Sequence, residues 1–126
     1  MCYAYMFRSC VNLTTAPAKL PATTLTGNCY SGMFQGCTSL TTAPELPAPV
    51  LAPSCYYKMF QVCINLNSVT CLATDISATG CVRNWLQDAG SNVTGTKTFN
   101  AVSTTEWPTD DESGIPSGWT RQNIDN

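Results

Sequence analysis

The sequence predicts an α/β solenoid of about three stacked turns of 26–27 residues, with short parallel strands and a C-terminal capping segment. Two observations support this fold. A nine-residue block recurs three times at almost constant spacing. The 126 residues are also 44% hydrophobic but only 11% charged, with 18 threonines and 10 serines, so hydroxyl groups rather than charges keep the surface hydrated.

The repeated block has Cys, Tyr, Met, Phe and Cys at fixed positions. It occupies residues 2–10, 29–37 and 55–63, and a leucine-containing segment follows each copy. One turn of this size cannot bury its own apolar face, so the copies must stack to form a common core. The predicted organisation is a solenoid over residues 1–80, with repeats 2–28, 29–54 and 55–80, and a cap over residues 81–126.

Each repeat is expected to contain one strand and one or two helical turns. We place the strands at 13–16, 40–43 and 66–69, and a proline ends the first two because it cannot donate a ladder hydrogen bond. Apolar residues three and four apart indicate helical turns in the repeated block. The residues expected in the core are Phe7, Phe34, Phe60, Leu13, Leu40, Leu66, Cys10, Cys37 and Cys63.

The closing segment predicts a different set of elements. Residues 81–89 place apolar side chains on one helical face, and Gly90 is a suitable residue to end such a helix. Residues 95–102 alternate weakly, as an edge strand does. A terminal unit of this kind would cover the last turn of the stack. The opposite edge, at Cys2, has no comparable cover, which indicates a truncated array or a partner there.

The string from Met33 to Leu40, followed by Leu46 and Pro47, resembles the leucine-rich repeats of the BspA-like type. These repeats occur in bacterial surface proteins and in proteins of phages that infect gut bacteria. The chain departs from the family pattern in its longer repeat and in the missing proline of its third copy. Residues 113–119 resemble the closing segment of such arrays. The resemblance implies a leucine-rich-repeat-like fold and an extracellular location, on a bacterial surface or a phage virion.

The eight cysteines are expected to be stacked thiols rather than disulfides. Equivalent cysteines on successive strands would lie ~4.8 Å apart, whereas the Cβ atoms of a disulfide lie about 3.5–4.5 Å apart. Any disulfide should therefore involve Cys71 or Cys81, which fall outside the cysteine columns or at their end. The lack of histidine and of a Cys-x-x-Cys pair argues against zinc. Residues 110–112 could hold calcium, but a solvated acidic loop is favoured. We expect no metal and no cofactor.

Several function classes are disfavoured by composition. Without histidine there is no ordinary nucleophilic triad, and the carboxylates are scattered over different turns, so we expect no catalytic residues and no enzyme. A net charge of −2 without a basic stripe argues against nucleic acid and anionic membranes. No apolar run is long enough to insert into a bilayer.

The remaining candidates are binding residues. The predicted strand face carries a threonine strip that resembles the face of flat ice-binding solenoids but is interrupted in the third repeat. Two tyrosines recur at one phase, and they either bind a partner or cover the core. The candidate ligand-binding residues are Thr14, Thr15, Thr41, Thr42, Asn67, Ser68, Tyr30 and Tyr56. The sequence favours a non-catalytic extracellular module that binds protein or glycan on a cell surface. The alternative is a structural component of a virion or surface assembly that docks through its open N-terminal edge.

Overall fold

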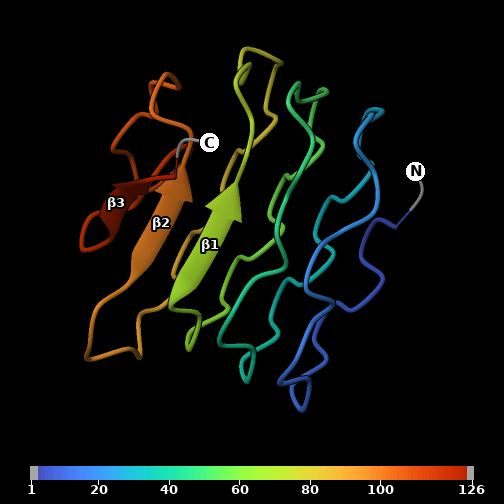
Figure 1. Ribbon diagram of the computed structural model, residues 1–126. Coiled ribbons are helices and arrows are strands. Elements are labelled where there is room, and N and C mark those ends of the chain that lie inside the picture. The colour runs from blue at the N-terminus through green and yellow to red at the C-terminus, as the bar shows by residue number, and fades with distance from the viewer. Residues whose placement is uncertain (1–2, 125–126) are drawn as a thin grey trace.

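The computed structural model describes residues 3–124, which form a small, strand-rich, repeat-like domain. Its one sheet has three short parallel strands in the order β1-β2-β3. These are β1 (Ser68–Cys71), β2 (Thr98–Ala101) and β3 (Thr120–Asn123). Figure 1 shows successive turns of the chain side by side, from the blue N-terminal end to the red C-terminal end. Of the strands predicted in the three repeats, only the one at 66–69 corresponds to an observed strand, β1, while β2 lies within the strand predicted at 95–102.

The parallel pairing continues toward the N-terminus as isolated bridges. Thr42 pairs with Ser68, and Lys19 pairs with Glu45. The strand predicted at 13–16 is absent, since the bridge of the first repeat is at Lys19. The strand predicted at 40–43 is reduced to the bridge at Thr42, and the third begins two residues later than expected. Prolines explain the reduction, because the segment from 44 to 49 holds three of them and each removes a ladder donor.

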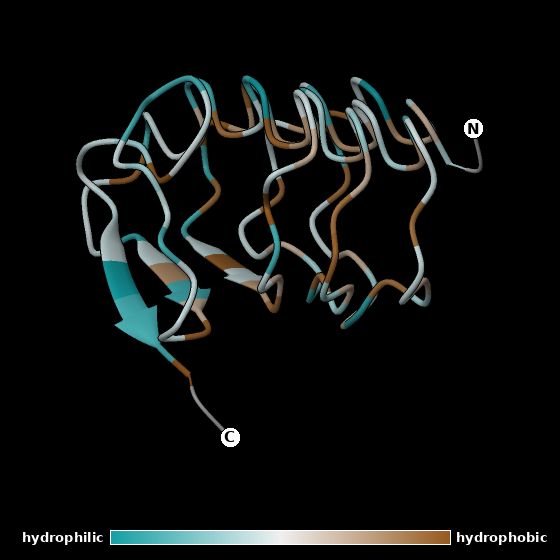
Figure 2. Ribbon diagram, turned by 90° about the horizontal axis from the view of Figure 1, so that it is seen from above, coloured by the Kyte–Doolittle hydropathy of each residue, from teal (hydrophilic) through white to brown (hydrophobic). Residues whose placement is uncertain are grey.

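The predicted helical turns are wrong. Within residues 3–124 there is no α-helix, and the repeated blocks are chains of hydrogen-bonded turns. We call residues 3–10, 28–37, 54–63 and 80–89 the turn blocks, and each full repeat a coil. In Figure 2 the turn blocks lie along one side of the molecule and the strands along the other.

Hydrogen bonding in the turn blocks alternates from residue to residue. The amides of Tyr30 and Phe34 donate to carbonyls of the next coil, at 2.9 Å and 3.0 Å. The amides of Ser31 and Met33 donate three residues back in their own chain, at 3.3 Å and 3.2 Å. In an α-helix every amide donates along its own chain. The amides that here donate to the next coil would then form no bond between coils. With the alternation, the amides that donate within the chain and the amides that donate to the next coil all have hydrogen-bond partners.

Left-handed backbone recurs every fourth residue in the turn blocks. Gly32, Gly36, Lys58 and Val62 all have positive φ. A positive φ at the third residue of a hydrogen-bonded four-residue turn is the mark of a type II turn. Apolar spacing of three and four residues fits this turn chain as well as a helix, which is why periodicity misassigned it.

Aromatic rings stack through the core from coil to coil. The ring centroids of Phe7 and Phe34 lie 5.6 Å apart, and those of Phe34 and Phe60 lie 5.7 Å apart. A second stack joins Tyr3, Tyr30, Tyr56 and Trp85 at 5.6–6.3 Å. The predicted core leucines Leu40 and Leu66 are fully buried, and Leu13 of the first coil is partly buried against the same core.

The segment predicted as a cap begins as a fourth turn block. The amide of Phe60 donates to the carbonyl of Trp85 at 2.8 Å, so the stack continues across residue 80. The helix predicted at 81–89 is therefore replaced by turns, although Gly90 has the positive φ expected of a stop residue. β2 is the middle strand of the sheet, not an edge strand, because β3 pairs with its outer side. The boundary at residue 80 stays a prediction.

The seven cysteines of the described region are free thiols. The Cys37 thiol donates to the carbonyl of Phe7, and the Cys63 thiol to that of Phe34, both at 3.0 Å. Cys10 heads this column at the partly exposed first coil. Cys2 lies outside the described residues. Cys37 and Cys63 therefore join neighbouring coils through thiol-to-carbonyl hydrogen bonds.

Residues 3–124 contain no helix with the length and apolar character needed to cross a membrane.

Candidate recognition face and cap hollow

The sheet aligns hydroxyl side chains from four segments. Ser68 pairs with Thr98, Thr98 pairs with Thr120, and the bridge pairs Thr42 with Ser68. We call Thr42, Ser68, Thr98 and Thr120 the hydroxyl row. Successive strand side chains point to opposite faces. The buried neighbours Val69 and Phe99 face the core, so the hydroxyl row faces outward.

The hydroxyl groups of this row are open to a ligand. Thr42 and Thr120 are exposed, and Ser68 and Thr98 are half-buried. Within residues 3–124 none of the four hydroxyls has a hydrogen-bond partner. The backbone amides and carbonyls of these strands are used in the parallel pairing, so a ligand on this face would be bound by side chains.

The structure brings the four predicted threonines into one groove of about 370 Å³, formed between the first two coils. The groove is lined by Thr14, Thr15, Thr41 and Thr42, together with neighbouring alanines and a proline. Asn67 lies beside it, and its amide donates to the carbonyl of Thr41 at 2.8 Å. The predicted interruption is therefore confined to Asn67, because Ser68 continues the row.

Thr98 and Thr120 were not found from the sequence. Ser68 and Thr98 are 30 residues apart, and Thr98 and Thr120 are 22 apart, so neither lies at the repeat spacing. A second polar row runs beside the first. In it Thr70 pairs with Asn100 and Asn100 with Gln122. The Asn100 amide donates to the Thr70 hydroxyl at 3.2 Å, so the outward face of the sheet is polar over two rows.

Tyr30 and Tyr56 were wrongly predicted to bind a ligand. Each is 1% exposed and lies within the aromatic stack, and burial raises the pKa of the Tyr56 phenol. A ring covered on both faces by neighbouring coils cannot reach a partner. The exposed tyrosines are Tyr3 and Tyr5, on the first coil.

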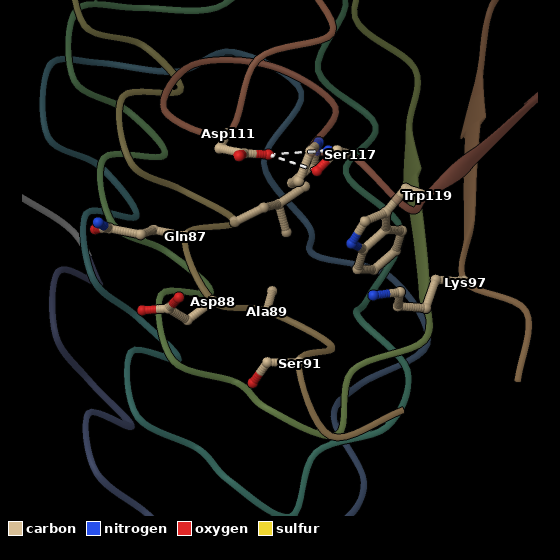
Figure 3. Close-up of a pocket in the computed structure, with 10 residues that line it drawn as sticks. Gln87, Asp88, Ala89, Ser91, Lys97, Asp111, Ser117 and Trp119 are labelled. Carbon is tan, nitrogen blue, oxygen red and sulfur yellow. Dashed lines mark hydrogen bonds between the residues drawn. The ribbon is translucent and has the colours of Figure 1, made fainter. Parts of the chain in front are cut away.

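A second hollow of about 370 Å³ lies between the fourth turn block and the loop at 111–119 (Figure 3). The Asp111 carboxylate accepts the amide and the hydroxyl of Ser117, at 2.9 Å and 3.4 Å. The Lys97 ammonium donates to the Gly90 carbonyl at 3.3 Å. Trp119 also lines the hollow, and its buried indole N–H has no hydrogen-bond partner within residues 3–124. The Asp111 bonds therefore close one loop on itself, and the Lys97 bond joins the segment before β2 to the end of the fourth turn block.

The acidic run at 110–112 forms a hydrogen bond within its own loop. One oxygen of the Asp110 carboxylate accepts the Glu112 amide at 2.7 Å. Among residues 3–124 no group of three or more metal-ligating side chains could hold a metal ion.

Comparisons with protein-family models, curated proteins and solved structures give no match for this chain.

Proposed function

We propose that this protein is a leucine-rich-repeat-like solenoid that acts as a non-catalytic recognition or attachment module. Its site is the outward sheet face centred on the hydroxyl row and the adjoining threonine groove. The observation that supports this is the alignment of four unpaired hydroxyls, one from each neighbouring segment of the stack. The resemblance to BspA-like repeats supports a location on a bacterial surface or a phage particle.

The chemistry of the face favours a neutral, hydroxyl-rich ligand such as a glycan. Neighbouring strands are ~4.8 Å apart, so the row presents a regular series of groups that can each donate and accept. The row itself carries no charge, so it offers little to a strongly charged partner. A polymer whose own hydroxyls repeat along its length could contact several members of the row at once.

The test is a triple variant, Thr42→Val, Ser68→Ala and Thr98→Val. If each lost hydrogen bond contributes about 1 kcal/mol, binding to a glycan array or to host cells should weaken about 100-fold. Replacing the exposed Thr23, Thr24 and Thr79 by Val is the matched control, because these threonines lie outside the row. A folded wild-type protein that binds neither glycans nor cells would contradict the proposal.

A second candidate function is structural, with the N-terminal edge docking onto another chain. It is favoured by Met6, which is 57% exposed although the equivalent Met33 is 4% exposed. A sizing experiment separates the two functions. A structural component should self-associate or need a neighbour for solubility, whereas a free-standing module should run as a monomer.

A further inference from the structure

We infer that the N-terminal edge is built to accept one more coil of the same repeat. This inference rests on the second candidate function and names the partner for it. The edge is formed by the first turn block, residues 3–10, which has a neighbouring coil on only one side.

The side chains at this edge are those of an interior coil. Tyr3 is 40% exposed and the equivalent Tyr30 is 1% exposed, the same contrast as between Met6 and Met33. Tyr3, Met6, Phe7 and Leu20 help to line an apolar cavity of about 190 Å³ that is open at this end. Solenoid ends normally carry a polar outer face, and this end keeps the apolar residues that stacking would bury.

The direction of hydrogen bonding defines what can cover the edge. The first three turn blocks donate alternate amides to the coil that follows, and the second, third and fourth blocks accept amides from the coil before them. In the second block the carbonyls of Ser31, Met33 and Gln35 accept from the first block, at 2.7–2.9 Å. The equivalent carbonyls of the first block belong to Ala4, Met6 and Arg8. Within residues 3–124 these three carbonyls accept no hydrogen bond.

The partner must therefore present three amide donors at two-residue spacing, which is what the following side of a coil provides. A second copy related by a two-fold axis would place acceptors against acceptors. A second copy in head-to-tail order meets its own cap, because Trp107 covers Trp85 at 5.3 Å and the Glu112 carbonyl accepts the Asn84 amide. The favoured partner is a coil whose following side is uncovered.

Two columns of side chains further define the coil that would fit this edge. A matching coil would place a tyrosine over Tyr3 and a phenylalanine over Phe7, as the second and third coils do for each other. Glutamines 35, 61 and 87 form a hydrogen-bonded column, and Arg8 lies at its first position. The Arg8 guanidinium lies 5.6 Å from the Tyr5 ring centroid and is exposed, so it could donate to an amide or carboxylate oxygen of the partner.

The experiment joins a copy of residues 28–53 directly before Met1, which keeps the repeat in register. Stacking should protect from hydrogen exchange the amides of Gly32, Phe34 and Gly36 in the added copy. It should also slow peroxide oxidation of Met6 about tenfold, because oxidation follows exposure. The control joins the same residues in scrambled order, which preserves length and composition but removes the register.

The outcomes separate the inference from the function it rests on. Equal Met6 oxidation and equal amide exchange in the ordered and scrambled fusions would overturn the inference. If the unfused protein then still self-associates, an assembly role stands, but through a surface other than this edge. If the ordered copy stacks while the unfused protein remains a soluble monomer, the edge accepts a coil as inferred and the structural function fails.

Discussion

At the residue scale, the left-handed positions of the turn blocks carry unequal strain. Val62 has a φ of 63°, a conformation that is costly for a β-branched residue, and Gly36 holds the equivalent place in the preceding coil. We predict that Val62→Gly stabilises the protein by about 0.5–1 kcal/mol, the relieved strain less the added chain entropy of glycine. Urea unfolding of the variant and the wild type measures the difference.

Val11→Gly is the matched control for this substitution. Val11 is also exposed, but it is not among the residues with positive φ. Glycine there adds only chain entropy and should be neutral or destabilising. A loss of stability in Val62→Gly equal to that in Val11→Gly would show that position 62 is unstrained.

The buried thiols give the protein a predicted alkaline limit. Burial raises the pKa of Cys63 and of Cys71 from 9.0 to about 12. A thiol whose folded pKa is raised stabilises the fold fully below its unfolded pKa, and this contribution falls as pH rises above about 9. Each such thiol should cost about 1.4 kcal/mol per pH unit between pH 9 and 12. Urea unfolding at pH 8, 9 and 10 measures the slope.

Cys63→Ala tests the source of this slope. The variant should be less stable at pH 8, because it loses a buried sulfur and its bond to the Phe34 carbonyl. Its stability should nevertheless fall less steeply above pH 9, since one titrating thiol is gone. An unchanged slope would assign the alkaline loss to other groups.

The sequence predicted core residues better than binding residues. Phe34, Phe60 and Leu66 recur at fixed phase because every coil needs the same buried group, so repetition alone locates them. Repetition also marked Tyr30 and Tyr56, yet it cannot tell a buried ring from an exposed one. Only the stacking of the coils shows that those two rings are covered.

At the scale of elements, the packing of the 108–114 loop on Trp85 depends on one close backbone approach. A Cβ added to Gly114 would lie 2.0 Å from the Pro108 carbonyl oxygen, and the Gly114 carbonyl accepts the Trp85 indole N–H at 3.0 Å. We predict that Gly114→Ala destabilises the protein by at least about 2 kcal/mol, because the loop must move off Trp85. Thermal unfolding measures the loss.

Gly95→Ala is the control, since a Cβ at Gly95 would meet nothing within 4 Å. Its stability should stay within about 0.5 kcal/mol of the wild type. If both variants unfold at the wild-type temperature, residues 108–114 do not approach each other as described.

The turn blocks could not be assigned from the sequence, because their amides alternate between acceptors in their own chain and acceptors in the next coil. The turn blocks send alternate amides along and across the chain, and no periodicity rule distinguishes that pattern from a helix. β3 (Thr120–Asn123) was missed because its four residues are all polar and it pairs on one side only. β2 (Thr98–Ala101) was found but placed at an edge, because its outer partner was not recognised.

At the scale of the whole molecule, stability should be graded along the stack. The amides of Phe7, Phe34 and Phe60 all donate to the next coil, at 2.8–3.0 Å. The first coil has one neighbour whereas the second and third have two, so the Phe7 amide should exchange at least about tenfold faster than the other two. Native-state hydrogen exchange followed by NMR measures the three rates.

Equal exchange rates at the three phenylalanines would mean that the stack opens only as a unit. That result would contradict the graded picture while leaving the fold intact. The same measurement on the fused protein described above should remove the difference between Phe7 and Phe34.

The candidate site was predictable in part at this scale. Thr14, Thr15, Thr41 and Thr42 lie within the repeat, and the structure places them on one groove. Two members of the hydroxyl row, Thr98 and Thr120, come from segments outside the repeat. Only the parallel register of the sheet aligns them with Ser68. A site assembled from irregular spacings leaves no periodic signal in the sequence.

The alternation of amide direction in the turn blocks also determines where the chain can change length. Deleting one residue between 28 and 37 would exchange the local and the inter-coil donors for the rest of that block. The segments between the turn blocks have no such alternation, and the one after the first block already holds one more residue than the one after the second, at Lys19. Natural insertions and deletions in proteins of this kind should therefore gather in these connecting segments, while the turn blocks keep a constant number of residues.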